Sequence, residues 1–504
     1  MLIVIRADAS TQIGTGHVMR CLTLADALSS QGAEVRFICR ELPGNMIDPI
    51  RQRGFRVETL TAVAQDQDTQ SDLEHGHWLT VSQQADAEQC ADLLAQARPD
   101  WLVVDHYALD QAWQKMLQPF YNKLLVIDDL ADRDHLADIL VDQTFGRQQA
   151  EYRDRVPESA QLLTGAQFAL LRTEFDTWRR RSLAERFSRE PTRILLSMGG
   201  IDADNRSGYI LEQLSHCQLP DNALITVVMG ANAPHIDAVR SLATQLPFAV
   251  DVRVNVSNMA ELMTSSDIAI GAAGSSTWER CCLGLPTLQV VIADNQKTIA
   301  RKLSAAGAVI ALQSNNLQDE LQALFRNRHK LALISSAIVC RSGVAQVVEQ
   351  MTGVADTDGS RQLMAATAEH CEFIYSLQTP EARRYSRTPE VPAFEDHQRW
   401  YQNFLARRDA VLFIVMKQGQ PAGFLRLDGI DGESPEISIV AAPAFQGQGI
   451  ASFAIRQGIA MLPGRELIGA VHRDNLASKT LFERLGFQLT SHDGDFLEYR
   501  YLSA

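Results

Sequence analysis

The chain has 504 residues, of which 46% are apolar and 21% are charged, and its formal net charge is −14. A chain of this length exceeds what one hydrophobic core usually holds, so the sequence predicts two to four domains. The acidic balance argues against a nucleic-acid partner, because phosphate backbones are bound by clustered lysines and arginines. It leaves room for a phosphorylated small molecule, since a local pocket lined by backbone N–H groups binds an anion whatever the net charge.

The sequence also bears on compartment and partners. No segment approaches the roughly 18–20 apolar residues that a membrane-spanning helix needs. The N-terminus carries only a short apolar run, 2–5, and no signal-peptide pattern. We therefore expect a cytoplasmic protein without a membrane partner, whose eight cysteines stay reduced. The sequence gives no view of the oligomeric state.

From the N-terminus to about residue 350, short apolar runs alternate with amphipathic segments of helical length. The runs are 2–5, 35–38, 101–104, 124–127, 194–196, 224–228, 268–270 and 287–291, and the helical segments include 17–30, 85–97, 258–265 and 295–306. Buried strands that alternate with helices form parallel sheets. A polar, Arg-rich stretch followed by Pro191 divides the region. We predict two Rossmann-like domains, 1–170 and 190–350, which bind ligands at the C-terminal ends of their strands.

Residues 352–361, TGVADTDGSR, are small, polar and rich in Gly and Asp, which is typical of a linker. Beyond them the runs 411–416, 423–427 and 437–440 follow one another through turns without intervening helices. This rhythm indicates a meander, so we predict an α+β domain over 362–504 after the two α/β domains.

A glycine-rich turn joins the first apolar run to the first helical segment. It reads Gly14-Thr15-Gly16-His17, and such a turn lets a ligand approach the backbone and the free N–H groups of the helix. The dinucleotide fingerprint G-x-G-x-x-G is broken at Met19, which argues against a nicotinamide or flavin. The helix dipole disfavours the cationic form of His17, and a neutral imidazole is what a general base needs. The alternative for His17 is a capping or core histidine.

Polar residues follow the ends of other predicted strands. Asp105, His106 and Tyr107 come directly after the run 101–104, where ligands bind in such sheets, so we interpret them as sugar-binding residues. Asp128 and Asp129 end another strand and either shape the site or cap the next segment. No H-E-x-x-H or similar spacing indicates a metal ion, and we expect none.

Two loops of the second domain are candidates for holding a diphosphate without a metal ion. Each lies between a strand and a helix, where N–H groups and hydroxyls are free to bind an anion. They consist of Gly199 and Gly200 in one loop, and of Gly274, Ser275, Ser276 and Thr277 in the other.

The run RADASTQIGTGHVMRCLTLA (6–25) resembles the start of the UDP-2,4-diacetamido-2,4,6-trideoxy-β-L-altropyranose hydrolases. The resemblance continues in VVDHY (103–107), VIDDLADRDH (126–135), LSMGGIDADN (196–205) and GAAGSSTWERCCLGLP (271–286), and it covers roughly residues 1–345. It implies a GT-B-like arrangement, a role in pseudaminic acid biosynthesis and a UDP-sugar substrate. In that family the histidine that matches His17 is the proposed base that activates water.

The resemblance also implies further substrate-binding residues. It places Gly14, Gly16 and Arg20 in the substrate loop and Asn255 beside the uracil. In related UDP-sugar transferases a glutamate at the position of Glu279 binds the ribose hydroxyls. An acidic residue favoured by the first helical turn is the alternative for Glu279.

The third domain carries two motifs in order. After the run 437–440 the sequence reads QGQGIA (446–451), and further on come N-x-x-S (475–478) and LGF (485–487). This pattern resembles the GCN5-related N-acetyltransferases, abbreviated GNAT. It implies acetyl-CoA as co-substrate, with its diphosphate on the N–H groups at a helix start. The implied cofactor-binding residues are Val440, Gln446, Gly447, Gln448, Gly449, Ile450, Ala451, Asn475 and Ser478.

The catalytic groups of this domain follow the same resemblance with one departure. Glu436 matches the position where many members place the base for the amine, and a surface acid at a strand end is the alternative. Many members carry a tyrosine that protonates the departing thiolate where this chain has Phe482. The segment 383–408 resembles an acceptor-binding region for a UDP-sugar, or is a helix with a solvated basic face. Its candidate contacts are Arg383, Arg384, Arg387, His397 and Trp400.

Together these features predict a bifunctional nucleotide-sugar enzyme. The third domain would acetylate the 4-amine of UDP-4-amino-4,6-dideoxy-β-L-AltNAc. The first two domains would then hydrolyse UDP-2,4-diacetamido-2,4,6-trideoxy-β-L-altropyranose to UDP and the free sugar. One alternative is a GT-B glycosyltransferase with a CoA-binding accessory domain, and a non-catalytic third domain is another.

Overall fold

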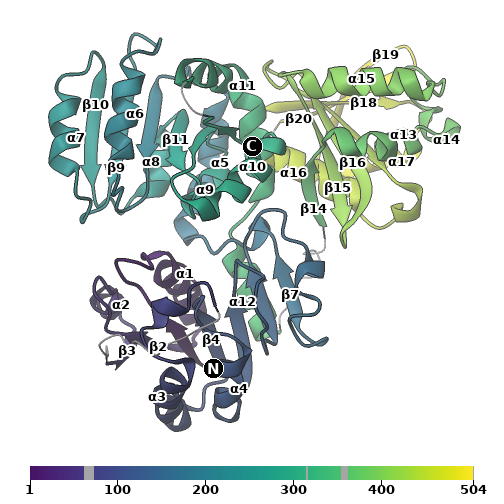
Figure 1. Cartoon of the computed structure of the whole chain (residues 1–504). Helices are drawn as coiled ribbons and strands as arrows, with labels where there is room; N and C mark the ends of the chain where they lie inside the picture. The colour runs from purple at the N-terminus through teal and green to yellow at the C-terminus, as the bar shows by residue number, and fades with distance from the viewer. Residues whose placement is uncertain (62–72, 314–315, 354–360, 503–504) are drawn as a thin grey trace. The chain divides into compact units, whose positions relative to one another are not determined.

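The computed structural model describes residues 1–61, 73–313, 316–353 and 361–502, and the described chain forms two compact units. The first unit comprises Met1–Thr173 and the segment that begins at Arg341. The second runs from Glu174 to Cys340 and continues with the chain beyond residue 360. Figure 1 labels the elements along the chain, and each unit is described by itself.

The first unit is built on a parallel sheet in the order β3-β2-β1-β4-β5-β6-β7. Its strands are β1 (Leu2–Ala7), β2 (Glu34–Arg40), β3 (Arg56–Leu60), β4 (Trp101–Asp105), β5 (Lys123–Ile127), β6 (Ile139–Asp142) and β7 (Gln161–Thr164). The helices of this part are α1 (Gly16–Ser30), α2 (Ile47–Gln52), α3 (Gln83–Ala97), α4 (Gln111–Leu117) and the short 3₁₀ helix η1 (Gly76–Leu79). Separate apolar cores on α1 and on α3 with α4 cover the two faces of the sheet.

The chain returns to the first unit with α12 (Gly343–Thr352). Its apolar face, Val344, Val347, Val348 and Met351, joins the core that α1 covers. The predicted second domain, 190–350, was therefore too long at its C-terminal end. Residues 341–350 belong with the first sheet because the apolar stripe of α12 is buried there.

The second unit begins with α5 (Thr173–Arg186) and a parallel sheet in the order β10-β9-β8-β11-β12-β13. The strands are β8 (Arg193–Ser197), β9 (Leu224–Met229), β10 (Ala249–Val254), β11 (Ile268–Ala272), β12 (Thr287–Val290) and β13 (Ile310–Ala311). Its helices are α6 (Arg206–Leu214), α7 (Ile236–Ala243), α8 (Met259–Ser265), α9 (Ser276–Cys282), α10 (Lys297–Ala305) and α11 (Leu317–Ile338). The order 3-2-1-4-5-6 is that of a Rossmann-like sheet.

The same unit contains a mixed sheet in the order β14-β15-β16-β17-β18-β20-β19. Its strands are β14 (Arg361–Ala365), β15 (Ala410–Lys417), β16 (Gln420–Asp428), β17 (Glu436–Ala441), β18 (Glu466–His472), β19 (Gln488–Asp493) and β20 (Phe496–Leu502). The helices are α13 (Cys371–Ser376), α14 (Pro380–Arg383), α15 (Phe394–Ala406), α16 (Ile450–Met461) and α17 (Leu476–Arg484). The parallel strands β17 and β18 pair only at Glu436 and Ile468, so they diverge beyond that point.

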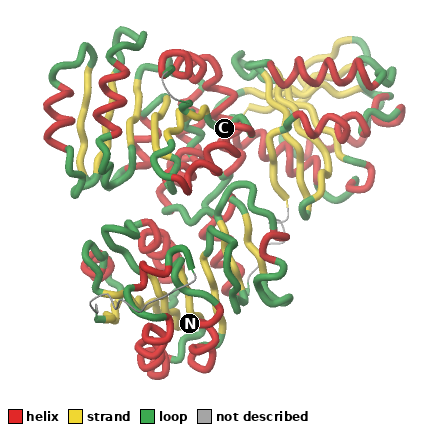
Figure 2. Tube along the Cα trace, in the orientation of Figure 1, coloured by secondary structure: helices red, strands yellow, loops and turns green. Residues whose placement is uncertain are grey.

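These sheets confirm the predicted fold class of two Rossmann-like domains followed by an α+β domain. Figure 2 shows the alternation of helices and strands in the first two and the mixed sheet of the third. Each predicted run became a strand, whereas nine strands were not predicted because they are short or alternate with polar residues, namely β3, β6, β7, β10, β13, β14, β18, β19 and β20. The predicted linker 352–361 lies largely outside the described residues.

One helical stretch of the described chain, 317–352, is long and apolar enough to cross a membrane by length and composition. The sequence alone predicts no such helix. In the structure 72% of its most apolar window is buried inside the protein, as in a core helix, and the stretch is interrupted between α11 and α12.

Candidate functional site

The glycine-rich loop of the first unit closes on itself before α1. The Gly14 N–H donates to the Ser10 carbonyl at 2.8 Å, and Gly14 has a φ of 77°, which favours glycine. The Ser10 hydroxyl accepts from the N–H groups of Gln12 and Ile13. The loop therefore brings the start of α1 to the carboxyl edge of β1 and its neighbour β4, where the strand order reverses.

His17, in the first turn of α1, meets the last residue of β4. Its Nδ1 lies 2.6 Å from Oδ1 of Asp105, which is fully buried. Arg20, one turn further along α1, donates to both oxygens of the same carboxylate at 2.6 Å. The structure thus joins three predicted site residues in one contact network.

The charge state of Asp105 fixes the tautomer of His17. Burial alone would raise the pKa of Asp105, but the charges of Arg20 and His17 and their hydrogen bonds outweigh it and hold that pKa well below its usual range. An ionised carboxylate only accepts, so Nδ1 of His17 carries the proton and donates it. The Nε2 atom of a neutral His17 then keeps its lone pair, as a general base requires.

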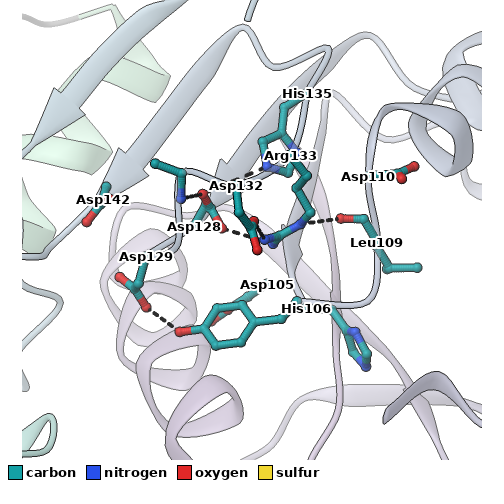
Figure 3. A network of polar contacts seen from close by, with 12 residues as sticks. Asp105, His106, Leu109, Asp110, Asp128, Asp129, Asp132, Arg133, His135 and Asp142 are labelled. Carbon is teal, nitrogen blue, oxygen red and sulfur yellow. Dashed lines mark hydrogen bonds and ion pairs between the residues drawn. The ribbon is translucent and has the colours of Figure 1, made fainter. Parts of the chain in front are cut away.

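A second carboxylate supports the network from β5. Asp129 accepts from Arg20 Nη1 at 2.5 Å and from the Tyr107 hydroxyl at 2.8 Å. Figure 3 shows Asp129 beside Asp128, which pairs with Arg133, and shows Asp142 of β6 nearby. The Tyr107 ring in turn stands edge-on to the His17 ring, with centroids 4.6 Å apart.

The sugar-binding prediction for the triplet after β4 needs correction. Asp105 has no exposed surface, so it orients His17 instead of touching a substrate. His106 is 3% exposed and lies 3.3 Å from the buried carboxylate of Asp8. Tyr107 is the half-buried member that borders the His17 ring. Successive side chains at a strand end point in alternating directions. The sequence of a polar triplet therefore does not determine which of its side chains face a ligand.

Two aromatic residues beside His17 were missed. Trp78 of η1 stacks on Tyr107 with centroids 5.6 Å apart and lies 6.0 Å from the His17 ring. His75 packs on Trp78 at 4.5 Å, and burial lowers its pKa. No motif marks them, because they come from the short 3₁₀ helix η1 and the residue before it, which only the tertiary fold brings to α1.

In the second unit, the predicted diphosphate loops leave neighbouring strands at one edge of the sheet. Gly199 and Gly200 follow β8, Asn255 follows β10, and Gly274 follows β11, in the spatial order β10-β9-β8-β11. Gly199, Gly200 and Asn255 are exposed, and Gly274 is partly buried. Asn255 has a φ of 54° and donates its N–H to the Met229 carbonyl of β9. The exposed backbone of this edge is suited to an anionic ligand.

Thr277 was predicted to contact the diphosphate, but unlike its loop neighbours it is buried. It is 1% exposed, and its hydroxyl accepts from Gln289 and Arg280, both at 3.1 Å. Arg280 is buried beneath the loop, donates to Ser276 and to the Ala272 carbonyl, and has a pKa that burial lowers to about 10. Thr277 therefore stiffens the loop, whereas Ser275 and Ser276 remain accessible. Glu279 is half-buried on α9.

The third predicted site lies in the mixed-sheet domain, at the loop between β17 and α16. The loop before α16 is exposed, and Gly447 and Gly449 have φ of 73° and 77°, which leaves the first N–H groups of α16 open. Lys417 of β15 donates to Gln448 at 2.6 Å, and the guanidinium of Arg361 lies beside Gly449. Neither cation was predicted. The loop therefore combines backbone donors and positive charge, as a diphosphate site needs.

The neighbouring predicted residues divide into exposed and structural ones. Asn475 caps α17 by accepting from the Ser478 N–H, so this pair shapes the second motif. Arg383 donates to Gln378 and Thr388, and His397 is 3% exposed, which favours the structural alternative for these two residues. Phe482 is buried against Gly469 and offers no proton to a thiolate.

Glu436 begins β17 and is partly exposed. Its Oε1 lies 3.4 Å from Nη1 of Arg387, an exposed arginine of the segment before α15. Among the described residues no group of three or more histidine, cysteine or acidic side chains is arranged to hold a metal ion.

Comparisons with known proteins match two parts of the chain to different families. Residues 362–488 match the acetyltransferase (GNAT) domain, and residues 211–351 match the C-terminal domain of glycosyltransferase family 28. The UDP-2,4-diacetamido-2,4,6-trideoxy-beta-L-altropyranose hydrolase of Campylobacter jejuni is 24% identical over 61% of this chain and 97% of its own. An uncharacterized protein of Methanocaldococcus jannaschii is 22% identical over 97% of each chain.

Among solved structures, MurG of Acinetobacter baumannii superposes with a TM-score of 0.51 and 15% identity, over 70% of this chain and 99% of its own. This similarity supports the GT-B-like fold of the N-terminal region and is evidence for the fold alone. The chain is thus a fusion. Its N-terminal region is homologous to the C. jejuni UDP-sugar hydrolase, and its C-terminal region is a GNAT domain.

Proposed function

We propose that this chain is a bifunctional enzyme of pseudaminic acid biosynthesis that acts in the cytoplasm. Its GNAT domain acetylates the 4-amine of UDP-4-amino-4,6-dideoxy-β-L-AltNAc with acetyl-CoA. Its N-terminal region then hydrolyses UDP-2,4-diacetamido-2,4,6-trideoxy-β-L-altropyranose. The observation that carries the hydrolytic half is the His17–Asp105 contact at the helix start, supported by homology to the C. jejuni hydrolase.

In the hydrolytic step, Nε2 of His17 takes a proton from water, and the water oxygen attacks the anomeric carbon. The bond between that carbon and the diphosphate oxygen breaks, and UDP leaves with the electron pair. Asp105 stabilises the imidazolium that forms, because it is ionised and hydrogen-bonded to Nδ1. The exposed loops at Gly199, Asn255 and Gly274 are the proposed UDP contacts.

In the acetylation step, the amine nitrogen attacks the thioester carbonyl of acetyl-CoA. A C–N bond forms, the C–S bond breaks, and Glu436 takes the proton that the amine loses. The thiolate is protonated by solvent, since Phe482 carries no acidic group. The exposed loop before α16 is the proposed site for the CoA diphosphate.

One assay tests both halves. The chain is incubated with the UDP-4-amino sugar, with and without acetyl-CoA, and the products are identified by mass spectrometry. We expect UDP release to depend on acetyl-CoA, and His17→Ala to accumulate the acetylated UDP-sugar. UDP release by His17→Ala at the wild-type rate would show that His17 is not the base.

A second candidate is a glycosyltransferase that transfers the sugar to another acceptor, with the GNAT domain as a CoA-binding accessory. The match to glycosyltransferase family 28 favours it. Isotopically labelled water separates the two, because hydrolysis places the label in the released sugar and transfer does not.

A further inference from the structure

A short segment before α15 lies over the start of β17 and the adjoining ends of β18 and β20. Arg387 reaches Glu436 of β17 at 3.4 Å, and its guanidinium carbon stands 5.8 Å from the Phe496 ring of β20. Two residues earlier, Tyr385 packs on the ring of His472 of β18 with centroids 5.3 Å apart. The segment therefore borders the proposed amine base directly.

The ion pair between Arg387 and Glu436 is open to solvent. The side chain of Arg387 is 63% exposed and that of Glu436 is 29% exposed. An ion pair this exposed contributes little to folding stability. A stabilising role therefore does not explain why Arg387 lies beside Glu436. Its position has a chemical consequence, because the guanidinium occupies the carboxylate oxygen that would accept a proton from an amine.

A further arginine lies next to this pair. Arg384 stacks on Tyr385 at 4.5 Å and is exposed, which adds a second guanidinium to the segment. Nearby, Arg473 pairs with Asp495 at 2.7 Å, and Asp474 lies 3.8 Å from His472. The exposed guanidinium of Arg384 attracts an anionic acceptor to the neighbourhood of Arg387.

We propose that Arg387 is the specificity-determining residue for the acceptor and selects an amine that carries a phosphate group. The phosphate draws the guanidinium from Glu436, because Arg binds phosphate oxygens through paired charge-assisted hydrogen bonds. Glu436 is thereby released to accept the proton of the amine. The proposal rests on the acetyltransferase half of the proposed function and names the feature that the GNAT domain recognises.

The coupling gives a distinctive kinetic signature. An amine without phosphate leaves Arg387 on Glu436, so it binds weakly and also reacts slowly. Removing Arg387 abolishes the phosphate contact and frees Glu436 at the same time. Arg387→Ala should therefore raise the KM of a phosphorylated acceptor and raise the kcat for an amine without phosphate.

The experiment measures CoA release by the full chain with three acceptors, which are the UDP-4-amino sugar, glucosamine 6-phosphate and spermidine. Wild type, Arg387→Ala, Arg387→Lys and the control Arg399→Ala are compared, and Arg399 pairs with Asp396 on α15 instead. We expect Arg387→Ala to raise the acceptor KM about 10–100-fold, as expected for a lost charge-assisted contact of about 1.5–3 kcal/mol. The KM for acetyl-CoA should not change, and Arg387→Lys should restore part of the loss.

The outcomes separate this proposal from the proposed function. If Arg387→Ala acetylates the UDP-amino sugar with the wild-type KM, the role of Arg387 is wrong and the proposed reaction stands. If only glucosamine 6-phosphate is acetylated and Arg387→Ala loses it, the selection of phosphate stands and the named substrate is wrong. If spermidine alone is acetylated, or no amine is, both are wrong. The thermal unfolding of each variant shows that it is folded.

Discussion

At the scale of single residues, the N-terminal site depends on a buried carboxylate that no substrate can reach. Asp105 is fully buried and binds both His17 and Arg20. Its ionised state sets the tautomer and direction of the imidazole, which the sequence suggested only as a histidine at a helix start. The proposed role of His17 as a base thus depends on Asp105, which the sequence alone predicts as a sugar-binding residue.

Asp105→Asn tests this role. The amide keeps the shape but no longer holds a proton on Nδ1 of His17, so kcat for UDP release should fall by about 10²–10⁴-fold, the range for a lost general base. The KM should stay within about twofold, because Asp105 touches no solvent. Asp26→Asn, at an exposed pair with Arg53, is the control. An increase in KM with an unchanged kcat would instead indicate a substrate contact.

A second buried carboxylate predicts a pH dependence of stability. Burial, and then the charge of Asp129, raises the pKa of Asp142 to about 6, and the Tyr152 hydroxyl lies 2.7 Å from both Asp142 and Asp128. The unfolded chain releases this proton near its usual pKa of about 3.9, so the folded state binds more protons between the two values. The free energy of unfolding should therefore fall by up to about 3 kcal/mol as the pH rises from about 4 to about 6.

Asp142→Asn removes this titration. Urea unfolding of both proteins at about pH 4 and about pH 7 measures the difference in pH slope, which is independent of any constant cost of the substitution. The slope of the variant should be smaller by the contribution of Asp142. Equal slopes would show that Asp142 is ionised throughout the folded state.

At the scale of elements, α12 shows how packing overrides position in the chain. It follows the second Rossmann-like sheet in sequence but buries Val344, Val347 and Val348 against the first. The first residue of α12, Gly343, packs directly against the backbone of Phe168 in the first unit. A Cβ on Gly343 would lie 2.1 Å from that backbone, so only glycine permits this approach. Neither this helix nor the sheet that it covers is predicted from the sequence.

Gly343→Ala should loosen this docking. The clash is with backbone atoms, which no rotamer relieves, so the first unit should lose at least about 1–3 kcal/mol. The Tm of the variant, measured by calorimetry, should fall by several degrees, in line with about 2–4 °C per kcal/mol for a domain of this size. Ala345→Ser, at an exposed position of the same helix, should change the Tm little. A Tm equal to wild type would mean that α12 shifts without cost.

At the scale of the whole chain, the second Rossmann-like sheet and the GNAT domain belong to one compact unit. Helix α11 packs on β14, β15 and α16. Lys330 of α11 donates to the carbonyls of Leu405 and Arg407 at 2.7 and 2.6 Å, and burial lowers its pKa. His329 adds a 2.7 Å contact to Asp431. The second Rossmann-like fold and the GNAT fold are therefore joined by packing and hydrogen bonds as well as by the covalent chain.

Lys330→Met tests that contact. Methionine preserves the length of the side chain but leaves the partly buried Leu405 carbonyl and the exposed Arg407 carbonyl without their donor, at a cost of about 1–3 kcal/mol. Calorimetry should show the GNAT domain unfolding separately and at lower temperature than in wild type. Lys297→Met, at an exposed pair with Asp294 on α10, is the matched control. An unchanged calorimetric profile would show that Lys330 does not hold the two folds together.

The sequence by itself determined the fold class, the family resemblance and the residues around which the sites form. Short buried runs and glycine-rich turns are local signals, since strand burial and helix-start geometry depend on neighbours in the chain. His17, the loop Gly447–Gly449 and the missing tyrosine at Phe482 were therefore visible without coordinates.

Only the tertiary structure decided which polar side chains face a ligand. Asp105, His106 and Thr277 are buried with internal partners, while Trp78 and Arg387 reach their sites from segments distant in sequence. These roles depend on long-range packing, which sets burial and the direction of each side chain. A local sequence pattern does not specify either one, because adjacent residues of a strand point to opposite faces.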